Sequence, residues 1–270
     1  MTFSEKSGVQ FAGIPWKGRT IQLEYQYIGA ADSPYPVVVF LHEGLGSIAM
    51  WRDFPEHFCN EHGLRGLMYS RYGYGRSTPR PADETLSPAY LHEQALEVLP
   101  ALLSQLGVQR PWLFGHSDGG SIALLYAANF PDAVSGLVVV APHIFVEELT
   151  VDGIRKVRET YLNSDFPRRL ARYHTDGDSV FWGWNDAWLD PAFRGWNIED
   201  QLGKIRCPVL ALQGEDDEYG TLEQIYGIER LVPNARAVPL AQCGHVPHRD
   251  QPALLSAQAG SFITGYLPRR

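Results

Sequence analysis

The chain has 270 residues, of which 44% are hydrophobic and 20% charged, and this composition supports one well-buried core. Its formal net charge of −8, with no run of lysine or arginine, argues against nucleic-acid binding. No apolar run is long enough to span a bilayer, and residues 1–10 lack the apolar centre of a secretion signal. Cys59, Cys207 and Cys243 are too widely spaced for a zinc site or a disulfide framework. We therefore expect a cytoplasmic protein with no membrane, nucleic-acid or metal partner.

Short strand-type runs alternate with helical patterns along most of the chain. Residues 19–28 alternate apolar and polar side chains, as expected of a half-exposed antiparallel strand at a sheet edge. Continuous apolar runs, typical of strands covered on both faces, lie at residues 36–41, 111–114, 137–140 and 208–212. Residues 90–106 and 122–129 have helical spacing. This order predicts an α/β fold with a mostly parallel sheet flanked by helices.

The alternation breaks between residues 143 and 203, where apolar residues follow helical spacing and aromatic residues are frequent. We interpret residues 143–203 as a small helical lid inserted between two core strands, with residues 1–142 and 204–270 forming the core. Such a lid would cover the carboxyl ends of the strands, where ligands bind in open α/β sheets. Trp182 and Trp184 are candidate substrate contacts. At least half of the lid tryptophans are nevertheless expected to form only the lid's own core.

Residues 112–123 contain the pattern Gly-x-Ser-x-Gly, with Ser117 at its centre. An apolar strand-type run precedes the pattern and an apolar helical run follows it, which is the context that this motif requires. The two glycines leave room for a sharp turn that lifts the Ser117 hydroxyl clear of the sheet. The main-chain N–H of Asp118 then points to the place where an oxyanion would form. We interpret Ser117 as a nucleophile and expect His116 to pack beside the turn.

A serine hydroxyl needs a base, and His245 is the best placed of the nine histidines. It follows the strand-like residues 235–240 in a Gly-His turn, from which an imidazole can reach over the edge of the sheet. His248, three residues later, is either a polar partner of the site or an exposed helix start. The orienting acid is expected in residues 215–218, four carboxylates directly after an apolar run. A solvated acidic turn accounts for the other three.

Taken together, these residues resemble the α/β-hydrolase superfamily over nearly the whole chain, in the order serine, acid, histidine. Its Gly-x-x-Asp pattern matches Gly214 and Asp217, so the resemblance implies that Asp217 is the acid, with Asp216 in reserve. Residues 244–248 resemble the family's Gly-His-x-Pro-His ending. Residues 70–77 resemble its Asp-x-x-Gly-x-Gly-x-Ser turn, with Ser70 in place of the aspartate.

Residues 41–47 resemble the family's His-Gly-x-Gly oxyanion loop, except that Glu43 stands where the family has glycine. The resemblance implies that Gly44 supplies the second oxyanion N–H and that His42 braces the loop. A carboxylate so near a developing oxyanion opposes catalysis unless it points away or is paired, and Arg71 is the expected partner. Glu43 is interpreted as a tied-down loop residue, with a substrate contact as the alternative.

The resemblance implies a hydrolase with a small-molecule substrate and no cofactor. A serine nucleophile argues against the dehalogenases and epoxide hydrolases of this fold, which resemble one another in using aspartate there. Three hypotheses stay open: hydrolysis of a hydrophobic or aromatic carboxylic ester, hydrolysis of a carbon–carbon bond or an enol-lactone in aromatic degradation, and ligand binding without chemistry. We favour the ester. The serine, acid and histidine together argue against the binding hypothesis, because a pure binding protein has no physical need for all three.

Overall fold

The computed structural model describes residues 8–81 and 83–267, so most of the N-terminal segment that was read as lacking a secretion signal lies outside the described residues. The strands are β1 (Gln10–Trp16), β2 (Arg19–Gly29), β3 (Val38–Leu41), β4 (Arg65–Tyr69), β5 (Trp112–His116), β6 (Gly136–Val140), β7 (Val209–Gly214) and β8 (Ala235–Leu240). The longer helices are α1 (Phe54–His62), α3 (Leu99–Gln105), α4 (Asp118–Asn129), α5 (Glu148–Asn163), α7 (Gly177–Leu189), α9 (Glu223–Leu231) and α11 (Pro252–Gly265). Short helical segments are η1 (Ile48–Trp51), α2 (Tyr90–Glu93), η2 (Gln94–Val98), α6 (Phe166–Leu170), η3 (Pro191–Phe193), α8 (Glu199–Leu202) and α10 (Pro247–Asp250).

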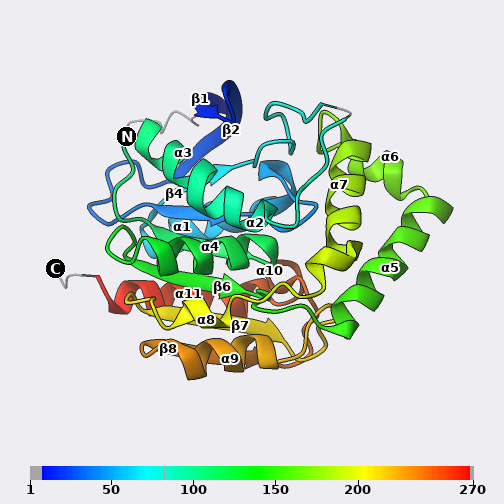
Figure 1. Cartoon of the computed structure of the whole chain (residues 1–270). Coiled ribbons are helices and arrows are strands. Elements are labelled where there is room, and N and C mark those ends of the chain that lie inside the picture. The colour runs from blue at the N-terminus through cyan, green and yellow to red at the C-terminus, as the bar shows by residue number, and fades with distance from the viewer. Residues whose placement is uncertain (1–7, 82, 268–270) are drawn as a thin grey trace.

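In the described part of the chain, the strands form a single sheet in the order β1-β2-β4-β3-β5-β6-β7-β8 (Figure 1). β2 is antiparallel to β1 and to β4, and every other neighbouring pair is parallel. This arrangement confirms the predicted α/β class with a mostly parallel sheet. No helix among the described residues combines the length and the apolar character needed to cross a bilayer.

The prediction that residues 19–28 form an edge strand is wrong. β1 pairs with β2 from Gln10↔Tyr25 to Trp16↔Arg19, and β4 pairs with its other side. The polar side chains of β2 alternate because one face of the strand is exposed, not because one edge is free. β1 and β4 were not predicted, since each contains residues that disfavour strands, Gly13 and Pro15 in β1 and Gly66 in β4.

Two apolar clusters cover the two faces of the sheet. On one face, side chains such as Phe40 and Phe114 pack with α1 and α11. On the other face, neighbours such as Val39 and Leu113 pack with η2, α3 and α4. Because successive strand residues point to opposite faces, a parallel strand buried on both sides must be apolar throughout. This is why continuous apolar runs marked β3, β5, β6 and β7 in the sequence.

The segment between β6 and β7 is helical, as expected, and an isolated bridge between Phe145 and Asn197 joins its two ends. α5, α6 and α7 pack against one another and stand together beside the sheet, at the right of Figure 1. α8 instead packs against α4 and α9, although it lies within the predicted lid range. The role of this group of helices as a lid stays a prediction.

Replacing Phe40 with alanine is expected to lower the free energy of unfolding by about 3–5 kcal/mol. Its side chain is fully buried, and its ring lies 5.2 Å from that of Phe114 and 5.8 Å from that of Trp51 between ring centroids. Guanidinium unfolding would measure the loss. Phe11→Ala is the matched control, because Phe11 is 50% exposed and its loss should change the free energy by less than about 0.5 kcal/mol. Equal effects of both substitutions would contradict the burial described here.

Candidate active site

Ser117 lies at the turn between β5 and α4, with φ of 52° and ψ of −118°. A positive φ is strained for a side-chain-bearing residue and persists only where the surroundings impose it. Here the surroundings do so by close approach: a Cβ at Gly115 would lie 2.2 Å from the Gly119 carbonyl oxygen, and one at Gly119 would lie 2.1 Å from the Leu41 carbonyl oxygen. Glycine at both positions therefore lets the strand, the helix and the end of β3 meet beneath the serine.

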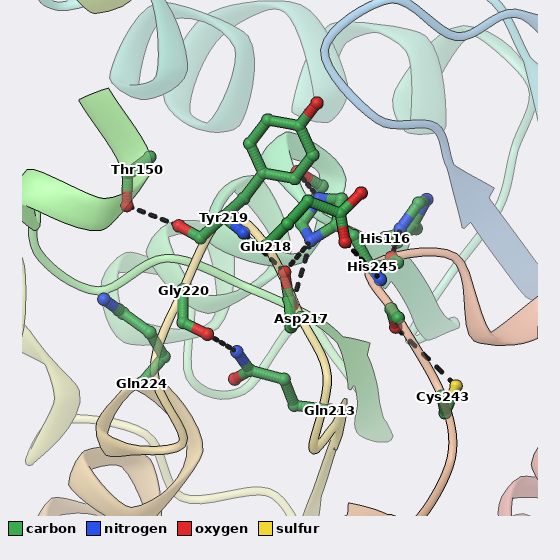
Figure 2. Close-up of polar contacts among 12 residues, drawn as sticks. His116, Thr150, Gln213, Asp217, Glu218, Tyr219, Gly220, Gln224, Cys243 and His245 are labelled. Atoms are coloured by element: carbon green, nitrogen blue, oxygen red, sulfur yellow. Dashed lines mark hydrogen bonds and ion pairs between the residues drawn. The ribbon is translucent and has the colours of Figure 1, made fainter. Parts of the chain in front are cut away.

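One hydrogen-bonded chain joins Ser117, His245 and Asp217. Figure 2 shows the part of this chain between His245 and Asp217. His245 Nδ1 lies 2.8 Å and 2.9 Å from the two carboxylate oxygens of Asp217, and its Nε2 lies 3.0 Å from Ser117 Oγ. Because the carboxylate accepts only, Nδ1 carries the proton and Nε2 is left to accept from the hydroxyl. Such an arrangement can remove the proton of a serine as its oxygen attacks an electrophile.

The loop after β7 is held so that Asp217 faces the imidazole (Figure 2). Asp217 Oδ1 accepts from the Tyr219 N–H at 2.9 Å, and Gln213 Nε2 donates to the Gly220 carbonyl at 2.7 Å. Thr150, on α5, donates to the Tyr219 carbonyl, which ties the inserted helices to this loop. Glu218, read from the sequence as part of a solvated acidic turn, accepts from the His245 N–H at 3.3 Å. Asp216, the reserve acid, is exposed.

Burial and charge set the protonation of the site. Burial disfavours the imidazolium, but the charge and hydrogen bond of Asp217 outweigh it and raise the pKa of His245 above its ordinary value. Burial disfavours the Asp217 carboxylate in turn, but His245 holds the pKa of that carboxyl below its ordinary value. Burial without such a partner lowers the pKa of His143 and of His248 to about 3, which keeps both rings neutral.

The loop after β3 differs from expectation in how Glu43 is paired. Arg71 Nη2 donates to the Glu43 main-chain carbonyl at 2.9 Å and to Asp118 Oδ2 at 3.4 Å, not to the Glu43 carboxylate. The expected ion pair between Arg71 and Glu43 is therefore wrong, because the guanidinium is taken by Asp118. The Glu43 carboxylate lies instead 3.7 Å from His116 Nδ1. Burial opposes its ionisation, but the neighbouring His116 holds the pKa of Glu43 well below its usual range.

Ser117 and His245 open into a cavity of about 920 Å³, which is also lined by Glu43, Gly44, Asp118, His248 and residues of η1, α1, α5, α6, α7, α10 and α11. Trp184 and Trp188 of α7 line it, whereas Trp182 packs on the outer side against Phe181, with its ring under Arg158. A Cβ at Gly44 would lie 2.1 Å from Trp184 Nε1, so the indole stands directly on the loop after β3. The described residues contain no group of three or more histidine, cysteine or acidic side chains arranged to hold a metal.

Three lining residues had no signal in the sequence. The Tyr219 ring lies 4.7 Å from the His245 ring, and the Trp51 ring lies 4.8 Å from the His248 ring, between centroids. His143 is buried, and its ring lies 6.1 Å from that of His245. Each of them belongs to a different loop or helical end, and only the parallel sheet brings these ends to one edge. His116 packs beside the turn as expected, with Nε2 donating to the His245 carbonyl at 2.7 Å.

Known proteins share this architecture. A family model described as the alpha/beta hydrolase fold matches residues 36–176. The chain is 27% identical to the sn-1-specific diacylglycerol lipase of Mus musculus, over 96% of this chain and 90% of the lipase. It is 24% identical to a proline iminopeptidase of Lactobacillus delbrueckii subsp. bulgaricus, over 82% of this chain and 86% of the peptidase. The solved enol-lactonase of Burkholderia xenovorans LB400 superposes with a TM-score of 0.73 at 19% identity, over 94% of this chain and all of that one, and shares the fold.

The Asp217 carboxylate is expected to keep the pKa of His245 above 6.5, and Asp217→Asn should bring it below that value. The reason is that the substitution removes the charge that stabilises the imidazolium, while burial, which disfavours it, remains. NMR titration of the imidazole resonances, with His245 assigned from its absence in His245→Gln, measures both values. Asp216→Asn is the matched control, since Asp216 is exposed. A larger fall in Asp216→Asn than in Asp217→Asn would overturn the assignment of the acid.

Proposed function

Because the chain belongs to the α/β-hydrolase family, we propose that it is a serine hydrolase that cleaves a carboxylic ester through an acyl-enzyme on Ser117. The observation that carries the proposal is the hydrogen-bonded chain from Asp217 through His245 to Ser117, opening into a cavity. A serine in any other surroundings is a poor nucleophile, because its hydroxyl keeps its proton at neutral pH.

In the proposed mechanism, His245 Nε2 takes the hydroxyl proton as Ser117 Oγ attacks the carbonyl carbon of the ester. The main-chain N–H groups of Gly44 and Asp118 hold the oxyanion that forms. His245 then gives its proton to the leaving alcohol, and the acyl-enzyme remains. Water enters, loses a proton to His245 and attacks the acyl carbon. As the acyl–oxygen bond breaks and the acid leaves, His245 returns this proton to Ser117 Oγ. Asp217 keeps the imidazole oriented and stabilises its charged form in both halves.

The lining of the cavity favours a hydrophobic or aromatic substrate. Aromatic and aliphatic side chains cover much of its wall, and α5, α6 and α7 supply one side of it as the proposed lid: Ile154, Val157, Phe166, Leu170, Trp184 and Trp188. A cavity of about 920 Å³ is large enough for a drug-sized ligand. These features support a small, largely apolar ester. Trp184 is the proposed contact among the lid tryptophans, because its indole stands on the oxyanion loop.

Glu43 helps to separate ester hydrolysis from the cleavage of a carbon–carbon bond in a ring-cleavage product. The pKa of Glu43 lies well below its usual range, so the side chain is a carboxylate at neutral pH. It lines the cavity next to Gly44 and is 24% exposed. An anionic ring-cleavage product would meet this charge on the cavity wall, whereas an uncharged ester or lactone would not be repelled by it. Glu43 therefore supports the ester over the carbon–carbon bond.

A fluorophosphonate probe is expected to label the native protein stoichiometrically and to leave Ser117→Ala unlabelled. His245→Ala should react more slowly by about 10³-fold or more, because no group then takes the hydroxyl proton. Intact-protein mass spectrometry would follow the labelling over time, and circular dichroism would establish that each variant is folded. Ser104→Ala, at an exposed serine at the end of α3, is the matched control and should label like the native protein.

A folded native protein that takes up no probe would sink the covalent mechanism and favour the ligand-binding hypothesis. Labelling that persists in Ser117→Ala would place the reactive group elsewhere.

Turnover of simple substrates distinguishes the remaining reactions. We expect kcat/KM for p-nitrophenyl butyrate to exceed that for an anionic vinylogous 1,5-diketone by about tenfold or more, because Glu43 repels the second compound. Glu43→Gln should narrow the difference by raising kcat/KM for the anion. Spectrophotometric assays of both compounds and of an uncharged enol-lactone measure the order of their kcat/KM values. Faster turnover of the diketone by the native protein would assign carbon–carbon hydrolysis instead.

A further inference from the structure

Arg71 links two segments of the candidate active site and has no role in the proposed mechanism. It follows β4, and its side chain is only 1% exposed. Through the single nitrogen Nη2 it reaches two segments far apart in the sequence, the Glu43 carbonyl at 2.9 Å and Asp118 Oδ2 at 3.4 Å. Each of these residues is attached to one of the two proposed oxyanion donors.

The first contact, between Arg71 Nη2 and the Glu43 carbonyl, fixes the direction of a peptide group. The Glu43 carbonyl accepts from Arg71 Nη2, from the Gly46 N–H at 3.1 Å and from His42 Nδ1 at 2.8 Å. His42 is fixed in this tautomer, because its Nε2 accepts from the Arg71 N–H at 3.0 Å and burial holds its pKa well below the ordinary value. In a trans peptide the N–H points opposite to the carbonyl. Three donors on the Glu43 oxygen therefore fix the direction of the Gly44 N–H.

The second contact, between Arg71 Nη2 and Asp118 Oδ2, fixes the first residue of α4. The Asp118 carboxylate is 1% exposed and accepts from Arg71 and from Tyr90 OH, the latter at 2.8 Å. Through these two contacts, the Asp118 side chain holds the first turn of α4 against the end of β4 and against α2. The main-chain N–H of the same residue is the second proposed donor, so its position is set by the same guanidinium.

We propose that Arg71 is a positioning residue that sets the two oxyanion donors relative to each other, one through the Glu43 peptide and one through the Asp118 side chain. The proposal rests on the proposed function, and it assigns to Arg71 a role in the transition state without contact to the substrate. Oxyanion donors are effective only when they are aimed in advance at the place where charge develops. A loop and a helix end from different parts of the chain need a shared anchor to achieve this.

A purely structural role does not account for this arrangement. Among the described residues, Arg71 Nε and Nη1 have no hydrogen-bond acceptor, and the guanidinium lies 4.7 Å from the Tyr74 ring centroid. Burying a charged group with unsatisfied N–H groups costs more than packing an apolar side chain of similar size. An apolar side chain would fill the same space, so the arrangement is better explained by what the guanidinium holds in place.

The test compares Arg71→Met with the double variant Arg71→Met/Asp118→Asn. The single variant leaves the Asp118 carboxylate buried without its cation, which by itself can damage the fold. The double variant removes both charges, keeps the main-chain N–H of residue 118 and restores electrical balance. We expect kcat for p-nitrophenyl butyrate to fall by about 10²-fold in both, with KM changed by less than about threefold, because the lost contact acts in the transition state.

Two further readouts separate positioning from general damage. The inhibition constant of phenylboronic acid, which forms a tetrahedral adduct with serine, should rise in parallel with the fall in kcat. The pKa of His245 by NMR should stay that of the native protein, since the hydrogen-bonded chain to Asp217 is untouched. Arg80→Met is the matched control: Arg80 is also buried, at 4% exposed, but donates to the Ser179 carbonyl on α7. It should lower the melting temperature without a selective loss of kcat.

A double variant with native kcat would overturn the proposal, because the loss in Arg71→Met would then come from the unpaired carboxylate alone. A rise in KM with unchanged kcat would overturn it as well, since it would assign Arg71 to substrate binding. If the native protein neither turns over the ester nor takes up the fluorophosphonate, the proposed function has failed, and that result is distinct from any result with the variants.

Discussion

The contact of His245 with both Asp217 and Ser117 is the constraint on which the rest of the structure depends. The first partner lies 28 residues away along the chain and the second 128 residues away. No local turn can join groups so far apart, and the parallel order of β5, β6, β7 and β8 does so by bringing their carboxyl ends to one edge. β5, β6 and β7 are covered on both faces and must then be apolar throughout, and each following loop must carry the polar groups. The parallel order of the strands is thus the common cause of the apolar composition of the sheet and of the polar groups at its carboxyl edge.

Burial acts on the site by selecting which groups are charged. His42 and His143 are buried and His248 is half-buried, none with a carboxylate partner strong enough to offset the desolvation, and the pKa of each is lowered. His245 is also buried, but the charge and hydrogen bond of Asp217 outweigh the desolvation and raise its pKa. The cavity wall therefore carries the neutral imidazoles of His143 and His248 close to His245, whose imidazole is ready to gain a proton. Glu43 stands apart as a carboxylate next to the oxyanion loop, kept ionised by His116.

The sequence predicted those parts of the molecule that depend on local patterns. Runs of apolar residues located β3, β5, β6 and β7, and the Gly-x-Ser-x-Gly context singled out Ser117. It did not predict β1, β4 or the partners of Arg71, because these depend on which segments meet after folding. The choice of Asp217 over Asp216 needed a family resemblance, since both follow the same strand. In the structure the difference is that Asp217 turns inward and accepts from the Tyr219 N–H, whereas Asp216 is exposed.

The sheet order leaves β1 and β8 as the outer strands of the described residues, and each carries a proline, Pro15 and Pro239. Proline has no main-chain N–H, so neither border offers an unbroken row of donors, and its ring obstructs a strand arriving from outside. An open sheet with two unpaired borders is otherwise a template for self-association and fibril growth. Pro15, which helps to hide β1 in the sequence, and Pro239 in β8 thus favour a sheet that ends at these two strands.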